Sequence, residues 1–199
     1  MKQLTETQEK IHEVARVHFL RDGFQKASLR KIVSEAGFTL GAFYGYYHSK
    51  EELFDALVGD TASGLIEVIS GMGDAADRLS MADRKAQMSD VFAHGLPGLL
   101  DYLLAHTEEV HLLLKCAEGT RYEHFLEELM ERDLKFMREI AGGELPMHEL
   151  SAKLLVNSYF SLLGEAALSG KTREEIAQAM QEIQDVYAGG MLYLMKGKA

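Results

Sequence analysis

Apolar residues recur along this chain at the three- and four-residue spacing of amphipathic helices, and no segment alternates as a β-strand does. In residues 5–22 one helical face is formed by Ile11, Val14, Ala15, His18 and Phe19. Gly23 follows this face as a stop signal. The pattern predicts an all-α chain of about nine helices.

Short helical segments and glycines alternate in the next part of the chain. Ser28 can cap a helix over 29–36, and Thr39 can cap another that runs to about residue 47. Two short helices joined by a turn that contains glycine, here Gly37, are typical of a helix-turn-helix.

Longer helices are predicted in the remaining three quarters of the chain. Their approximate ranges are 50–70, 84–105 (bent near Pro97), 120–141, 146–169 and 172–195, with a short helix after Thr107. Two of these helices begin with a predicted capping box, S-x-x-E at Ser49 and T-x-x-E at Thr172. Residues 71–84 are the expected flexible connection.

Charge is distributed unevenly along the chain. The 199 residues have a net charge of −10, which by itself argues against a nucleic-acid partner. Residues 1–50, however, hold eight Lys and Arg and five Asp and Glu, so this part is basic. Because salt screens charge beyond about 8–10 Å, a basic head on an acidic body can still attract phosphate. Ordinary variation of charge along a helical protein is the alternative.

Several function classes find no support in the sequence. One cysteine, Cys116, no signal peptide and no long apolar run predict a cytoplasmic protein without a membrane span. No nucleophile elbow, phosphate-binding loop or zinc-protease motif occurs, so we expect no enzyme and no cofactor. His106 and His111 are five residues apart and fall on different helical faces, so we expect no metal site.

The stretch TLGAFYGYYHSKEEL, residues 39–53, combines aromatic rings with glycines in a way that suits neither a core nor an ordinary surface. With the preceding residues it resembles the DNA-binding domain of TetR-family transcriptional regulators. The matching features, in order and at spacing, are Ile11, Ala15, Phe19, Gly23, Ser28, Ile32, Ala36-Gly37, Gly41, Phe43-Tyr44 and the run from Ser49 to Leu53. The family usually has phenylalanine at the position of Tyr47, and often a basic or small polar residue at that of Leu40.

The resemblance implies a helix-turn-helix domain at residues 1–49, with the motif at about 28–47, and a helical regulatory, ligand-binding and dimerisation domain at residues 50–199. Helix four would join the two. The residues expected to contact DNA are Ser28, Arg30, Lys31, Thr39, Leu40, Gly41, Tyr44, Tyr47, His48 and Lys50. The N-terminal residues of the motif's second helix would meet base edges, with Thr39 at a cap or phosphate and Lys50 as a phosphate clamp.

The acidic remainder of the chain, residues 50–199, would then form the dimer and bind an effector. The last two helices mix apolar with small residues, which suits a close seam between helices, although an intramolecular core explains the same pattern. The predicted dimer residues are Leu154, Ser158, Ser161, Leu162, Gly164, Ala167, Met180, Ile183, Tyr187 and Met191. The candidate lining of a pocket for a small, largely apolar effector is His94, Tyr102, His106, His111, Cys116, Tyr122, Phe125, Met137 and Asn157.

The sequence thus predicts a ligand-responsive repressor that binds a palindromic operator as a homodimer, in the cytoplasm and associated with the nucleoid. The alternative is a helical interaction protein that has lost DNA binding.

Overall fold

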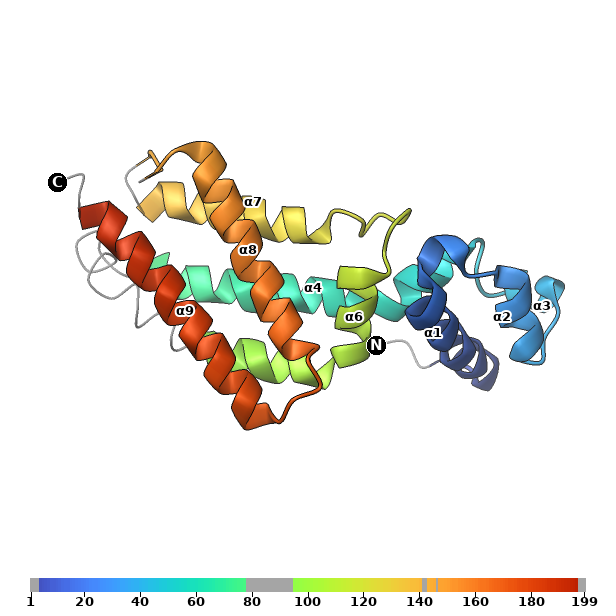
Figure 1. The fold of residues 1–199 in the computed structure, drawn as a ribbon. Coiled ribbons are helices and arrows are strands. Elements are labelled where there is room, and N and C mark those ends of the chain that lie inside the picture. The colour runs from blue at the N-terminus through green and yellow to red at the C-terminus, as the bar shows by residue number, and fades with distance from the viewer. Residues whose placement is uncertain (1–3, 78–94, 141–142, 146, 197–199) are drawn as a thin grey trace. The chain divides into compact units, whose positions relative to one another are not determined.

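The computed structural model describes residues 4–77, 95–140, 143–145 and 147–196, and within these ranges it is helical and contains no strand (Figure 1). The helices are α1 (Glu6–Lys26), α2 (Leu29–Glu35), α3 (Leu40–Tyr44), α4 (Lys50–Asp77), α6 (Thr107–Lys115), α7 (Phe125–Ile140), α8 (Glu149–Ala167) and α9 (Arg173–Lys196). Residues 95–105 are helical as well. The all-α prediction is confirmed. The start predicted near Arg84 and the expected role of Pro146 lie outside the described residues.

The chain folds into two compact units. The first, the head unit, consists of residues 1–63 and 108–123, and the second, the body unit, of residues 64–107 and 124–199. Helix α4 therefore contributes its first part to the head unit and the remainder to the body unit, while most of α6 belongs to the head unit.

Side-chain caps explain where several helices begin. The Thr5 hydroxyl accepts from the Gln8 N–H while the Gln8 side chain accepts from the Thr5 N–H, which is a complete capping box. The predicted box at Thr172 and Glu175 is also complete, with N–O distances of 3.1 and 3.2 Å. At Ser49 the prediction is half right, because the Glu52 carboxylate accepts from the N–H of His48 and not of Ser49.

Helix ends differ from the sequence prediction where tertiary contacts or turns intervene. Gly23 does interrupt α1, with φ at 74°, but the chain resumes a helical turn as far as Lys26. Helix α3 ends at Tyr44, three residues early, with Gly45 as its C-cap. Helix α7 begins at Phe125 because the preceding residues form a turn, in which the Thr120 hydroxyl donates to the Ala117 carbonyl.

The core of the head unit is built around aromatic rings. Phe19 and Phe24 from α1 and Phe54 from α4 form a triangle with centroid distances of 5.2 to 5.8 Å. Edge-to-face contacts of this kind add to the stability that burial of apolar area provides. Ile32 and Val33 from α2 and Phe43 from α3 are also buried, so the helix-turn-helix rests on α1 through its own apolar side.

Candidate DNA-binding surface and dimerisation groove

Helices α2 and α3 and the turn between them form a helix-turn-helix. The Ser28 and Thr39 hydroxyls cap the two helices by accepting from the N–H groups of Lys31 and Ala42. Between the helices the backbone reverses at Gly37, whose φ of 83° suits glycine, and the Phe38 N–H donates to the Val33 carbonyl. The sequence therefore sets the motif locally, through two caps and one glycine.

One side of α3 is buried and the other is open. The Phe43 side chain is fully buried, whereas Gly41, Ala42 and Tyr44 are exposed and Leu40 is half-exposed. In a helix-turn-helix this second helix enters the major groove of DNA. Among the predicted contact residues, Leu40, Gly41 and Tyr44 thus lie where a groove would meet them. Thr39 is also exposed, with its hydroxyl held by the cap.

Positive charge lies beside this surface on α2. Arg30 and Lys31 are exposed on α2, and no ion pair of either side chain is present among the described residues. Ser28, next to them, is half-buried and acts as the cap. These two cations can approach the phosphates that border a major groove.

Lys50 has a structural position that the sequence did not suggest. Its ammonium donates to the carbonyl oxygens of Phe24, Gln25 and Ala27 at 2.6, 3.2 and 3.0 Å. It also lies 4.3 Å from the centre of the Phe24 ring, and burial lowers its pKa. Because an ammonium has three N–H donors, none is left for a phosphate. We therefore leave Lys50 out of the contacts proposed below.

Tyr47 is likewise engaged inside the head unit. Its side chain is 4% exposed, and its hydroxyl lies 2.6 Å from Nε2 of His12 and accepts from the Gln8 amide at 3.3 Å. Burial, with a smaller effect of Arg16, lowers the pKa of His12, which favours a neutral ring that accepts the tyrosine proton. The extra hydroxyl relative to the family's phenylalanine thus ties the end of the motif to α1. His48 is exposed and lies against the Glu52 carboxylate.

The candidate effector residues are divided between the two units. His94 lies outside the described residues. His111, Cys116 and Tyr122 belong to the head unit, while Tyr102, His106, Phe125, Met137 and Asn157 belong to the body unit. Of these, the rings of Tyr102 and His106 have centroids 4.5 Å apart and are tilted by 42°, and the Asn157 side chain is exposed on α8. Tyr122 donates its hydroxyl proton to Asp55, which gives it a role in holding the head unit together.

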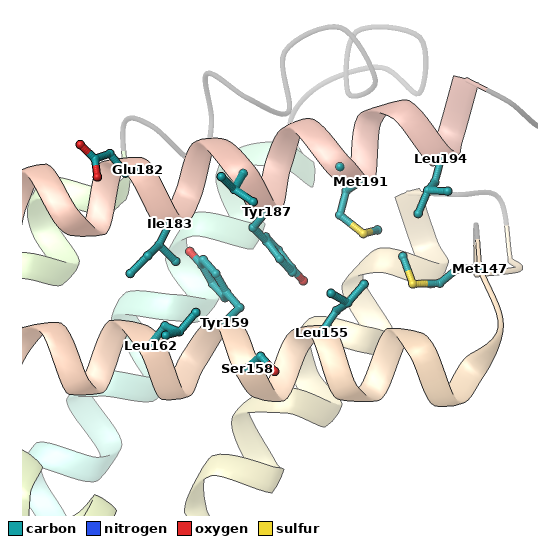
Figure 2. Close-up of a pocket in the computed structure, with 12 residues that line it drawn as sticks. Met147, Leu155, Ser158, Tyr159, Leu162, Glu182, Ile183, Tyr187, Met191 and Leu194 are labelled. Carbon is teal, nitrogen blue, oxygen red and sulfur yellow. The ribbon is translucent and has the colours of Figure 1, made fainter.

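An apolar groove of about 450 Å³ runs between α8 and α9 on the body unit (Figure 2). Its lining consists of Met147, Leu155, Ser158, Tyr159, Leu162, Glu182, Ile183, Val186, Tyr187, Gly190, Met191 and Leu194. Several apolar side chains at or near it are open to solvent, including Leu162 at 50% and Val186 at 78% exposure. Patches of this kind on a helical surface are typical of protein interfaces.

The predicted dimer residues divide between this groove and the interior. Ser158, Leu162, Ile183, Tyr187 and Met191 line the groove, and Leu154 is exposed on the same helix as Leu162. Gly164, Ala167 and Met180, by contrast, are buried within the body unit, and Ser161 is half-buried. For those three positions the intramolecular alternative explains the pattern. Val186 and Leu194 also line the groove, although they are not among the predicted residues.

Known proteins resemble the chain in both its head and its overall fold. The family model described as "Bacterial regulatory proteins, tetR family" matches residues 11–57. Over this N-terminal part the chain is similar to TetR-family regulators. A curated relative, the uncharacterized HTH-type transcriptional regulator YfiR of Bacillus subtilis (strain 168), is 30% identical over 96 residues, which are 48% of this chain and 45% of that protein. The match thus spans less than half of that relative's length.

Solved structures of TetR-type regulators share the fold. A transcriptional regulator from Aquifex aeolicus VF5 is 23% identical, with a TM-score of 0.56 over 88% of this chain and 96% of the other. A TetR-like regulator from Rhodococcus sp. RHA1 is 18% identical, with a TM-score of 0.59 over 92% and 96%.

Two further observations concern the described residues of the chain. None of the helices placed there is both long and apolar enough to pass through a membrane. Nor do three His, Cys, Asp or Glu side chains gather in those ranges as a metal ion requires.

A buried polar cluster, which sequence reasoning missed, joins α7, α8 and α9 of the body unit. The Tyr187 hydroxyl donates to the Asp133 carboxylate at 2.7 Å, and Tyr187 stacks on Tyr159 with ring centres 4.2 Å apart. Tyr159 in turn donates to the side-chain carbonyl of Gln184, whose amide nitrogen is buried without a partner among the described residues. The two tyrosine rings line the groove, so this cluster supports its floor.

Burial raises the pKa of Asp133 to about 6, against a smaller opposing effect of the hydrogen bond from Tyr187. The folded state holds this proton more tightly than the unfolded state. The proton therefore contributes its full amount to the free energy of unfolding below about pH 4, and this contribution is lost as the pH rises through about 6. Above pH 6 the charged carboxylate costs on the order of 3 kcal/mol.

Asp133→Asn is therefore expected to stabilise the protein at pH 7.5 by about 1–2 kcal/mol, because part of that cost is offset by burial of the amide. At pH 4.5 the gain should shrink, since the native carboxyl is then largely protonated. Thermal unfolding of both proteins at the two pH values measures the difference. Glu128→Gln, an exposed change on the same helix, is the control and should give no pH-dependent gain. Equal gains at both pH values would contradict the assignment.

Proposed function

We propose that the chain is a transcriptional regulator that binds a specific DNA site through its helix-turn-helix. The observation that carries the proposal is the open face of α3, where Gly41, Ala42 and Tyr44 are exposed while Phe43 anchors the helix in the core. Arg30 and Lys31 on α2 would contact the flanking phosphates. The net charge of −10 does not prevent binding, because Arg30 and Lys31 are exposed on α2, the helix that precedes α3, and salt screens the more distant acidic groups.

A second copy of the chain would cover the α8–α9 groove. The groove contains one charged side chain, Glu182, and otherwise presents apolar and small groups. Helices α8 and α9 of two copies can bury such a surface in a four-helix bundle. With a two-fold axis between the copies, each contributes the same patch to the interface. TetR-family regulators usually dimerise, which supports this occupant. Two reading heads related by a two-fold axis would bind a palindromic operator.

Repression released by an effector completes the proposal. Its support is the similarity to TetR-family regulators and the separate body unit, which α4 links covalently to the head. A ligand that binds the body can change DNA affinity only through a difference in its own affinity for two arrangements of the protein. DNA would then weaken ligand binding by the same factor. A protein with this role acts in the cytoplasm, where the bacterial chromosome lies.

The test is selection of DNA from a random duplex library by the purified full-length protein. We expect enrichment of an inverted repeat and affinity for it that falls steeply with salt concentration. Exchange of Arg30 and Lys31 for glutamate should remove binding, whereas Lys135→Glu, on an exposed face of α7, should leave it intact. A library that stays unenriched after repeated rounds would contradict the proposed function.

A further inference from the structure

The open face of α3 carries almost no group that can exchange hydrogen bonds with a base edge. Residues 39–47, TLGAFYGYY, contain no Arg, Lys, Asn or Gln, which are the side chains that read guanine and adenine through paired hydrogen bonds. The Thr39 oxygen already accepts from the Ala42 N–H at 3.2 Å. The polar groups that remain in this stretch are the Thr39 O–H as a donor and the hydroxyls of Tyr44 and Tyr46, on side chains 54% and 37% exposed.

Glycine at position 41 is not required by the fold. Its φ lies outside the left-handed region, and a Cβ placed there would meet only Oγ1 of Thr39, at 3.8 Å, an ordinary contact. Glycine within a helix costs about 1 kcal/mol relative to alanine. A position that gives up this stability without an internal reason is suited to a close approach from outside the chain.

The surface that results consists of methyl, methylene and ring groups around a bare backbone. Leu40 and Ala42 flank Gly41 in the chain, and Tyr44 lies one helical turn beyond Leu40. In the major groove, the apolar group that a base pair can present is the C5-methyl of thymine, and apolar side chains are its recognised partners.

We propose that α3 reads its operator mainly through thymine methyl groups, contacted by Leu40, Ala42 and Tyr44, with the α3 backbone brought close to the bases at Gly41. The operator then carries A·T base pairs opposite α3, and G·C pairs there are disfavoured because α3 has no Arg or Lys to pair with guanine and no Asp or Glu to accept from cytosine. This inference rests on the proposed function and names the chemistry by which it achieves specificity.

The first experiment removes the methyl groups alone. Once selection has given the binding site, each dT of one half-site is replaced by dU, which keeps base pairing and deletes the C5-methyl. Affinity should fall about fourfold for each contacted methyl, the factor that corresponds to about 0.8 kcal/mol per buried carbon group. Replacement at dT positions outside the half-site is the control and should have no effect.

The second experiment removes the partner on the protein. Leu40→Ala should weaken binding to the dT site while reducing the penalty for dU at one position, the signature of a lost pairwise contact. Gly41→Ala should leave thermal stability unchanged or higher, yet weaken operator binding roughly tenfold or more, because the new methyl holds the helix away from the bases. Gly98→Ala, at an exposed helical glycine of the body unit with open space around it, is the matched control.

The outcomes separate this inference from the proposed function. A selected site with wild-type affinity after complete dU replacement, or one with G·C pairs opposite α3, would overturn methyl reading while DNA binding stands. Undiminished binding by a folded Gly41→Ala protein would overturn the close approach. Failure to select any sequence would overturn the proposed function itself, and the inference with it.

Discussion

If a second copy covers the α8–α9 groove as proposed, the unchanged protein is a dimer at micromolar concentration and Leu162→Glu is expected to be a monomer. Leu162 lines the α8–α9 groove and is 50% exposed, so the substitution leaves the interior of the body unit intact. In a dimer the new carboxylate would be buried against apolar groups of the partner, and an unpaired buried charge strongly opposes association. Light scattering with size-exclusion chromatography gives the mass directly.

The affinity of Leu162→Glu for operator DNA should fall because the dimer is lost. Two linked heads bind a palindrome with an avidity that exceeds single-site affinity by about 10²–10⁴, so we expect a loss of roughly 100-fold or more for Leu162→Glu. Val17→Glu is the matched control, because Val17 on α1 is an apolar residue of similar exposure, 60%, outside the groove. Val17→Glu should remain dimeric. A dimeric Leu162→Glu protein would show that a second copy does not cover this groove.

Lys50→Met should lower thermal stability by roughly 5–10 °C and leave the salt dependence of DNA binding unchanged. The substitution keeps the aliphatic stem but withdraws the donor from the carbonyls of Phe24, Gln25 and Ala27. Hydrogen bonds from a charged group contribute about 1.5–3 kcal/mol each when buried and less when solvent competes, so we expect a total loss of about 2–3 kcal/mol.

Lys31→Met is expected to have the opposite effects to Lys50→Met on stability and on the salt dependence of DNA binding. Lys31 is exposed on α2, so its removal should leave stability as it is and reduce the salt slope by about one per subunit. Scanning calorimetry and titrations of operator DNA at several salt concentrations separate the two effects. If Lys50→Met instead reduces the salt slope at wild-type stability, the ammonium exchanges its carbonyl partners for a phosphate on binding.

The features predicted well from the sequence are those fixed within a few residues. The helix-turn-helix is defined locally, by caps at Ser28 and Thr39 and by the left-handed glycine at position 37. Because each feature involves residues close in sequence, the motif can be predicted from the sequence. Family resemblance then indicated the function of the motif, which its local pattern alone does not distinguish from other helical turns.

The features that were missed depend on contacts between distant residues. Lys50 reaches carbonyls 23 to 26 residues earlier in the chain, and the Tyr47 hydroxyl reaches His12 over 35 residues. Asp133 lies in an acidic, amphipathic helix where a solvated carboxylate is the usual expectation, and nothing local indicates its tyrosine partner. Small residues such as Gly164 and Ala167 suit any close helix contact, so sequence could not distinguish the interior from a seam.

The division of the chain has a consequence for exchanging DNA specificity between regulators. The polypeptide passes between the head and body units three times, near residues 63, 107 and 123, so the head is not a single N-terminal stretch. The Cys116 carbonyl accepts from the Phe24 N–H, and Arg121 pairs with Asp55. A chimeric regulator that takes only residues 1–63 from this chain would have foreign side chains at the positions of Cys116 and Arg121. Transplanting residues 108–123 together with the N-terminal segment preserves the head as one transferable module.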